Sequence, residues 1–86
     1  MPSYTVDEIQ QKTIAIVAVA LRLKPEDISL ASHLQRDLSA DSLDTLNIAE
    51  RLEEEFGIEI PNEVAQEFMT VSAIVSGIAK LIESQR

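Results

Sequence analysis

Ser42 is the residue whose type and surroundings most clearly suggest chemistry, because it lies between Asp41 and Asp44 where a helix is expected to begin. A serine hydroxyl in that position can be a nucleophile, a helix cap or an attachment point for a covalent group. These three interpretations predict three different kinds of protein, and the rest of the sequence must distinguish between them.

A catalytic role for Ser42 lacks the partners that such chemistry requires. A nucleophilic serine needs a base within reach and an oxyanion hole. The chain has one histidine, His33, which falls in a long expected loop, where a polar surface residue is the ordinary interpretation. The segment Ser39-Ala-Asp-Ser-Leu43 is not the G-x-S-x-G elbow of hydrolases. We therefore expect that the protein is not an enzyme.

The clustered aspartates do not predict a built metal site. Asp37, Asp41 and Asp44 do not follow the calcium-loop pattern D-x-[DN]-x-[DN]-G, and no glycine supplies its sharp turn. The chain has no cysteine, so it offers neither a disulfide nor a thiolate of its own. Loose binding of divalent cations is the most that these carboxylates suggest.

Two interpretations of Ser42 remain open on physical grounds. Asp41 or Ser42 can accept a hydrogen bond from the free amides of the first helical turn, and Asp44 interacts favourably with the helix dipole. The same exposed hydroxyl suits covalent attachment, because a phosphodiester there would lie at the positive end of the dipole. The local pattern is therefore compatible with both a cap and an attachment point.

The charge of the chain is unevenly distributed. The net charge is −8, and residues 37–67 contain ten of the fifteen acidic residues but a single basic one, Arg51. Such a field repels nucleic acid and anionic lipid and attracts basic protein surfaces. A solvated face that keeps the protein soluble is the other explanation of the same charges.

Length and composition predict one small domain, residues 1–86. With 45% hydrophobic residues the chain is not expected to be disordered, and its two glycines favour helices over a sheet. The longest apolar run, residues 14–21, is much shorter than the roughly 20 residues that span a bilayer. The N-terminus has no secretory-signal pattern. We expect a cytoplasmic protein that neither inserts into membranes nor binds nucleic acid.

Four helical segments are predicted from caps and breakers. Thr5-Val-Asp-Glu8 is a capping-box pattern, and the first helix should continue to about Leu21. A second helix should begin near Ser42 and stop at Gly57. The expected order is completed by a short third helix opened by Pro61, a last helix capped by Thr70, and a long loop over 24–41 anchored by Ile28, Leu34 and Leu38.

Apolar residues on these segments predict which faces are buried. The expected core residues are Ile9, Ile16, Val17, Ala20 and Leu21; Leu43, Leu46, Ala49, Leu52 and Phe56; Val64, Ala65 and Phe68; and Val71, Ile74, Val75, Ile78 and Ile82. A second apolar strip on the first helix consists of Ile14, Ala15, Ala18 and Val19, and it can be a wider buried face or a contact surface. The predicted fold is all-α: a four-helix bundle with three main helices, a short third helix and a long first loop.

The motif "ADSLDT", followed by "LEEEFGIEIP" and by "TV" before the last helix, resembles the acyl carrier protein family. The resemblance runs from about Thr5 to Ile82 and includes "KPEDI" and the "DL" before the serine. It implies that Ser42 carries a phosphopantetheine arm, which a phosphopantetheinyl transferase adds from coenzyme A. It also implies that the arm holds acyl intermediates as thioesters for partner enzymes of fatty-acid, lipid or polyketide-type biosynthesis.

The resemblance further implies a use for the acidic segment. The family's second helix docks on basic patches of acyl-transferring or condensing enzymes, and such charges mainly speed encounter and set orientation. Carried over by position, the partner-binding residues are Asp41, Leu43, Asp44, Glu50, Glu53, Glu54 and Ile60. The carrier itself is expected to be a monomer.

Several residues depart from the common fatty-acid pattern. They are Ser39 in place of the usual glycine, Asn47 and Asn62 in place of acids, Glu50 in place of an apolar residue, and Arg51, which adds a positive charge. Most of these changes alter the partner-facing surface, so a specialised carrier with a dedicated acyltransferase, synthase or ligase is an alternative to a housekeeping role. The alternative from another class is an acidic, non-catalytic interaction module in which Ser42 is only a cap.

Overall fold

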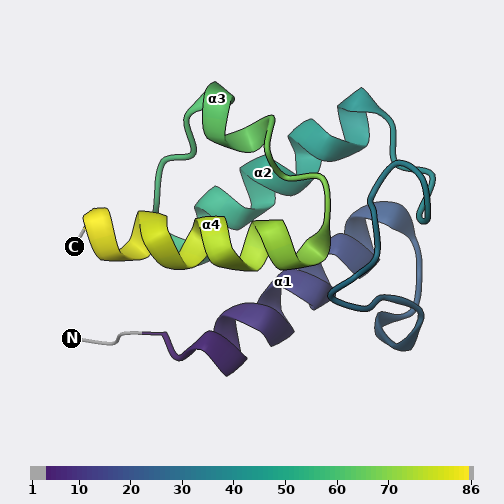
Figure 1. Cartoon of the computed structure of the whole chain (residues 1–86), viewed down its shortest axis with the longest axis horizontal. Helices are drawn as coiled ribbons and strands as arrows, with labels where there is room; N and C mark the ends of the chain where they lie inside the picture. The colour runs from purple at the N-terminus through teal and green to yellow at the C-terminus, as the bar shows by residue number, and fades with distance from the viewer. Residues whose placement is uncertain (1–3, 86) are drawn as a thin grey trace.

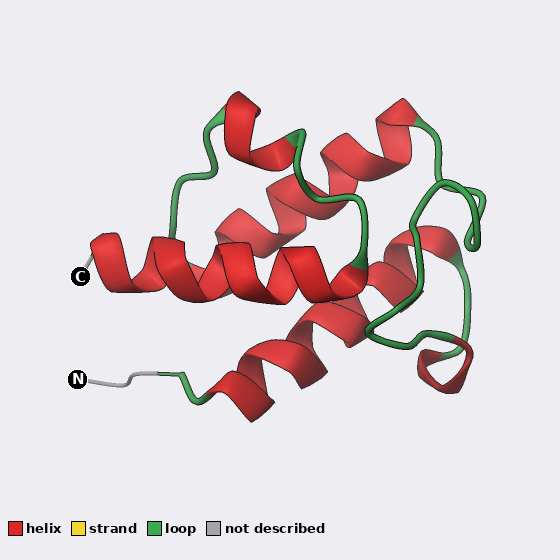
Figure 2. Cartoon of the chain, in the orientation of Figure 1, coloured by secondary structure: helices red, strands yellow, loops and turns green. Residues whose placement is uncertain are grey.

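The computed structural model describes residues 4–85 of the chain. Its elements are α1 (Val6–Leu21), the 3-10 turn η1 (Pro25–Asp27), α2 (Ser42–Phe56), α3 (Asn62–Ala65) and α4 (Val71–Ser84) (Figures 1 and 2). The predicted all-α bundle, with three main helices, a short third helix and a long loop between the first two, is confirmed. Within residues 4–85, no helix combines the length and apolar character needed to cross a membrane.

The predicted helix caps account for most of the helix boundaries. Thr5 caps α1 in a capping box: Glu8 N donates to Thr5 Oγ1 at 3.1 Å, and Thr5 N donates to Glu8 Oε1 at 2.9 Å. Thr70 caps α4 by accepting a hydrogen bond from Ala73 N at 3.1 Å. Pro61 occupies the cap position of α3, one residue before the helix that it was expected to begin.

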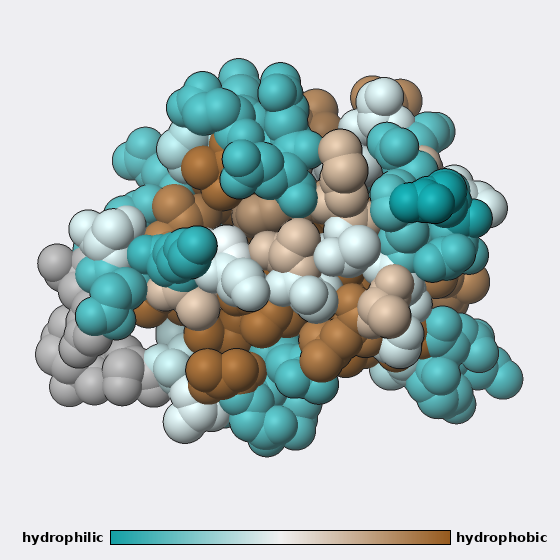
Figure 3. Space-filling view, in the orientation of Figure 1, coloured by the Kyte–Doolittle hydropathy of each residue, from teal (hydrophilic) through white to brown (hydrophobic). Residues whose placement is uncertain are grey.

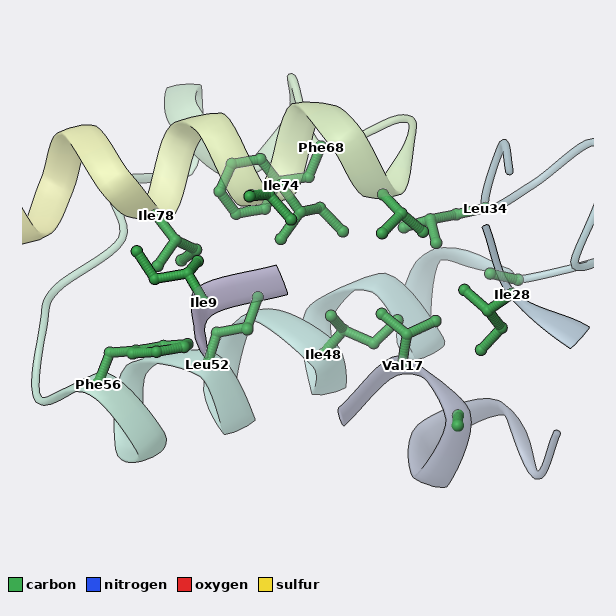
Figure 4. Packing of buried hydrophobic residues seen from close by; sticks show 14 of the residues in the cluster. Ile9, Val17, Ile28, Leu34, Ile48, Leu52, Phe56, Phe68, Ile74 and Ile78 are labelled. Atoms are coloured by element: carbon green, nitrogen blue, oxygen red, sulfur yellow. The ribbon is translucent and has the colours of Figure 1, made fainter. Parts of the chain in front are cut away.

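One core lies where α1 packs against both α2 and α4 (Figure 4). It includes Ile9, Val17, Ile28, Leu34, Ile48, Leu52, Phe56, Phe68, Ile74 and Ile78. The last helix buries the predicted residues Val71, Ile74, Val75 and Ile78, and Ile82 packs at the edge of the core.

The predicted core stripe of α2 is partly wrong. Leu43 and Leu46 are 75% and 54% exposed, whereas Ile48, which was not included, is buried. The reason is the helical period: at 3.6 residues per turn, Leu43 and Leu52 are two and a half turns apart and therefore point to opposite sides. Steps of three residues drift around the helix, so the stripe 43-46-49-52 does not follow one face.

The buried face of α1 includes more residues than the predicted core face of this helix. Thr13 and Ala18 are buried together with Ile9 and Val17, and the other predicted residues of the face are half-buried. Of the second apolar strip, Ala18 joins the core and Ile14 packs against it, but Ala15 and Val19 are exposed. The strip is therefore divided between core and surface.

The long loop is fastened to the segment before α4 by backbone hydrogen bonds. Leu34 N donates to Met69 O at 2.8 Å, and Val71 N donates to Ser32 O at 3.1 Å. His33, expected to be a plain surface residue, is half-buried here, and its ring nitrogen Nδ1 accepts a hydrogen bond from Arg36 N at 3.1 Å. The predicted anchors Ile28 and Leu34 are buried, and Leu38 is half-buried.

The surface in the orientation of Figure 1 is mostly hydrophilic over α3 and over the long loop, as Figure 3 shows. Hydrophobic side chains reach this surface between α4 and α1 (Figure 3).

On α2 itself, the exposed large hydrophobic residues are Leu43 and Leu46, both close to Ser42 in the sequence. The start of α2 is therefore an apolar spot within an acidic segment.

Candidate functional site

Ser42 is the first residue of α2, and Asp41, not Ser42, caps the helix. Asp44 N donates to Asp41 Oδ1 at 2.8 Å, and Asp41 N donates in return to Asp44 Oδ2 at 3.1 Å. These two bonds form a capping box that satisfies the first turn. The Ser42 side chain is exposed, and its hydroxyl has no hydrogen-bond partner among residues 4–85. The hydroxyl is therefore free for chemistry.

The electrostatic surroundings of the Ser42 hydroxyl can accommodate an anionic group. The N-terminus of a helix carries a partial positive charge and favours phosphate nearby. The carboxylates of Asp41 and Asp44 already bond the amides of this turn, so they partly offset that charge. A phosphodiester on Ser42 would remain exposed to water at this position and would not need a buried counter-charge.

The chain enters α2 through a left-handed residue, Ser39, whose φ is +60°. Glycine adopts this conformation freely, whereas a residue with a β-carbon pays about 1–2 kcal/mol. The next residue, Ala40, is buried and donates its N–H to Leu34 O at 2.9 Å. This geometry gives a physical reason for the glycine that the family resemblance leads one to expect at position 39.

A cleft of about 380 Å³ begins at Ser42 and runs between α2 and the segment that contains α3. The "Ser42 cleft" is lined by Leu34, Gln35, Ser42, Thr45, Leu46, Ala49, Asn62, Ala65, Gln66, Phe68 and Met69. Its deeper residues, Leu34, Ala49 and Phe68, are buried and apolar, while Gln35, Asn62 and Gln66 are exposed. The arrangement joins an exposed hydroxyl to an apolar interior. Sequence patterns did not predict this cleft.

The predicted partner-binding residues divide into two groups. Asp41, Leu43, Glu50 and Glu54 are exposed, and Asp44, Glu53 and Ile60 are half-buried. Leu43, Glu50 and Glu54 are separated by seven and four residues, so they project from one side of α2. We call these three residues the docking face, after the prediction that partner enzymes bind there. Glu53 does not point freely to solvent, because its Oε2 accepts a hydrogen bond from Ile60 N at 2.8 Å.

Two of the unusual residues on α2 contact each other. Arg51 Nε donates to Asn47 Oδ1 at 3.3 Å, one helical turn apart. The contact holds a positive charge on α2 beside the docking face.

No group of three or more His, Cys, Asp or Glu side chains gathers into a possible metal site in the part of the chain that the structure describes.

Two comparisons with known proteins bear on this site. The family described as "Phosphopantetheine attachment site" matches residues 11–78, a range that contains Ser42 and every residue of the Ser42 cleft. The chain is also 44% identical over 71 residues to an acyl carrier protein of Thermosynechococcus vestitus. That alignment covers 83% of this chain and 88% of the relative.

Proposed function

The chain belongs to the acyl carrier protein family, and we propose that the hydroxyl of Ser42 is the point at which it carries its phosphopantetheine arm. The protein is a non-catalytic carrier of acyl intermediates, and phosphopantetheine is its prosthetic group. The interaction module with a serine cap is not favoured, because the family match points to a carrier and Asp41 supplies the cap.

The observation that carries the proposal is the freedom of the Ser42 hydroxyl at the mouth of an apolar cleft. In the attachment step, the Ser42 oxygen bonds to the phosphorus of the 4′-phosphate of the arm. The pyrophosphate bond of coenzyme A breaks, the adenosine bisphosphate half leaves, and the hydroxyl proton passes to the transferase. When bound, the arm supplies the thiol that this cysteine-free chain lacks.

The Ser42 cleft supports a role in sheltering the acyl group near the arm. An acyl chain that leaves water for the surface of Leu34, Ala49 and Phe68 gains about 0.8 kcal/mol for each buried methylene. The polar side chains of Gln35 and Asn62 at the exposed end suit the amide-rich arm. The chain's own contribution is thus to exclude water from the acyl group.

The family also implies partners: enzymes that handle acyl groups, and a phosphopantetheinyl transferase. The proposal for this chain is that basic patches on these enzymes meet the docking face of Leu43, Glu50 and Glu54, with Asp41 beside the attachment point. Arg51 lowers the negative field of that face, so a dedicated partner enzyme is an alternative to the common fatty-acid enzymes. Three statements remain predictions: residues 1–86 form a single domain, the carrier is a monomer, and it is located in the cytoplasm.

Intact-mass measurement tests the attachment site. The purified chain is incubated with a phosphopantetheinyl transferase and coenzyme A, and the wild type is expected to gain the mass of one arm. Ser42→Ala should gain none, while keeping its fold, because the hydroxyl has no partner to lose. Ser39→Ala is the matched control and should still be modified. An arm on Ser42→Ala would overturn the assignment.

A further inference from the structure

The ring of Phe68 lies between two cavities. It lines the Ser42 cleft, and it also lines a second cavity of about 310 Å³ between the α3 segment and α4. The second cavity is further lined by Val64, Glu67, Ala73, Ser76, Gly77, Lys80 and Leu81. Phe68 is itself buried and belongs to the core cluster that Figure 4 draws. Phe68 is therefore the residue that the linings of the two cavities share.

Gly77 on α4 makes room for this ring. A β-carbon built on Gly77 would lie 2.6 Å from Cε1 of Phe68 and 3.2 Å from its Cζ. Real β-carbons essentially never approach a ring atom so closely, so any larger residue at position 77 would have to displace the ring. A glycine inside a helix is otherwise unfavourable. The large residue at 68 and the absent side chain at 77 fit together as a pair.

We propose that Phe68 sets the length of acyl chain that the carrier shelters, by forming a movable partition between the Ser42 cleft and the second cavity. The inference rests on the proposed attachment at Ser42 and on occupancy of the cleft by the acyl group. A short chain ends before the ring. A longer chain must turn the ring aside to reach the second cavity.

The composition of the second cavity fits the apolar end of such a chain. Val64, Ala73 and Leu81 are half-buried apolar residues, whereas Glu67, Ser76 and Lys80 are exposed at the rim. Each methylene buried in the Ser42 cleft should favour the sheltered state about fourfold, which corresponds to about 0.8 kcal/mol. That gain stops where the chain meets Phe68, since further burial requires displacement of a packed aromatic ring.

The test uses the full chain loaded with a series of saturated acyl groups of increasing length, transferred with the arm from the acyl-coenzyme A. The melting temperature is measured for each length. For the wild type, the melting temperature should rise with chain length and then level off. We call the acyl length at which the rise stops the levelling point. Phe68→Leu should move the levelling point to longer chains. Gly77→Ala, which pushes the ring toward the cleft, should move it to shorter chains.

Val17→Ala is the control for general loss of packing, because Val17 is buried but lines neither cavity. It should lower every melting temperature and leave the levelling point unchanged. An unmodified wild type would mean that the attachment proposal fails. Normal loading with the same levelling point in Phe68→Leu, Gly77→Ala and Val17→Ala would overturn the partition alone.

NMR of the wild type gives a second measurement that needs no destabilised variant. The chain contains two phenylalanines, and Phe56 lines neither cavity, so its ring is an internal reference. The ring protons of Phe68 should shift once the acyl chain is long enough to reach them, at the length where the melting temperature levels off. Phe68 signals that stay constant for every chain length would overturn the proposal even if Phe68→Leu did not fold.

Discussion

The carboxylate of Glu53 accepts a hydrogen bond from the backbone N–H of Ile60 at 2.8 Å, so α2 directly holds the chain that leads into α3. Both residues belong to the partner-binding set carried over by position. The structure shows a role for them in the fold, because the bond spans seven residues and fixes the turn after Gly57. Glu54, the next residue, is exposed and has no such bond among residues 4–85. Adjacent glutamates on the acidic helix are therefore not equivalent.

This difference predicts different effects of Glu53→Ala and Glu54→Ala on stability. Loss of the partly buried, charge-assisted bond of Glu53 should lower the free energy of unfolding by about 1–2 kcal/mol. Glu54→Ala should change it by no more than about 0.5 kcal/mol. Urea unfolding measures both values, and equal losses in the two variants would contradict a structural role for Glu53.

Arg51→Gln should speed association with a basic partner enzyme. The change removes the positive charge that Asn47 holds beside the docking face, and charges at the rim of an interface act mainly on the association rate. Stopped-flow rates at low salt should rise, and the gain should shrink as salt screens the charges. Arg36→Gln, an identical charge change in the long loop, is the control. An equal gain from Arg36→Gln would assign the effect to net charge.

Thr13→Val should stabilise the fold. Thr13 is fully buried in α1, and its Oγ1 has no hydrogen-bond partner in the described part of the chain. A buried hydroxyl without a partner costs about 1–3 kcal/mol, and valine has nearly the same shape without that hydroxyl. We expect the free energy of unfolding to rise by about 1 kcal/mol. Thr13→Ser, which keeps the hydroxyl and loses the methyl group, should lower it, and a loss in both variants would disprove the explanation.

Helices α1 and α2 each end at a residue with a positive φ. Introducing glycine at the first end and removing it from the second should therefore have opposite effects on stability. Arg22 ends α1 with φ of +60°, and Gly57 ends α2 with φ of +63°. Arg22→Gly should stabilise the protein by up to about 1 kcal/mol, since it removes the strain of a β-carbon. Gly57→Ala should cost about 1 kcal/mol through the backbone alone, because no atom beyond the two adjacent residues lies within 4 Å of the added carbon. Thermal unfolding of both variants checks the signs.

The capping box of α1 predicts a pH dependence. Hydrogen bonds from the backbone and side chain of Thr5 hold the pKa of Glu8 below its ordinary value of 4.5. Unfolded Glu8 therefore takes up its proton at a higher pH than folded Glu8. Its contribution to stability is present above pH 4.5 and is lost as the pH falls through the folded pKa. The difference in stability between wild type and Glu8→Gln should shrink over that range, and a constant difference would contradict it.

Local signals account for what the sequence could predict of the fold. Thr5, Gly57 and Thr70 act on amides or carbonyls within a few residues, so their patterns identify helix ends without any knowledge of packing. The side of α2 that is buried depends on where α1 and α4 lie. The stripe through Leu43 and Leu46 was therefore wrong although the helix itself was right.

The site shows the same division between local and long-range information. The residues around Ser42 and the acidic segment are contiguous, and the motif could be read directly. The Ser42 cleft collects residues from the long loop, from α2 and from the α3 segment, and no spacing rule connects Leu34 with Phe68. The pairing of Phe68 with Gly77 is equally invisible in the sequence, because a helical glycine usually suggests only a weak point.

The two ends of the described chain are fastened at the far end of α2. The Tyr4 ring stacks edge-on against Phe56 with centroids 4.9 Å apart, and the Gln85 side chain bonds both N and O of Glu59. Ser42 lies at the other end of this 15-residue helix, about 22 Å away along its axis. A fluorescent label or surface tether joined near Tyr4 or Gln85 would thus be attached at the end of α2 that lies away from the serine. Immobilisation at that end would leave the Ser42 hydroxyl accessible to solution.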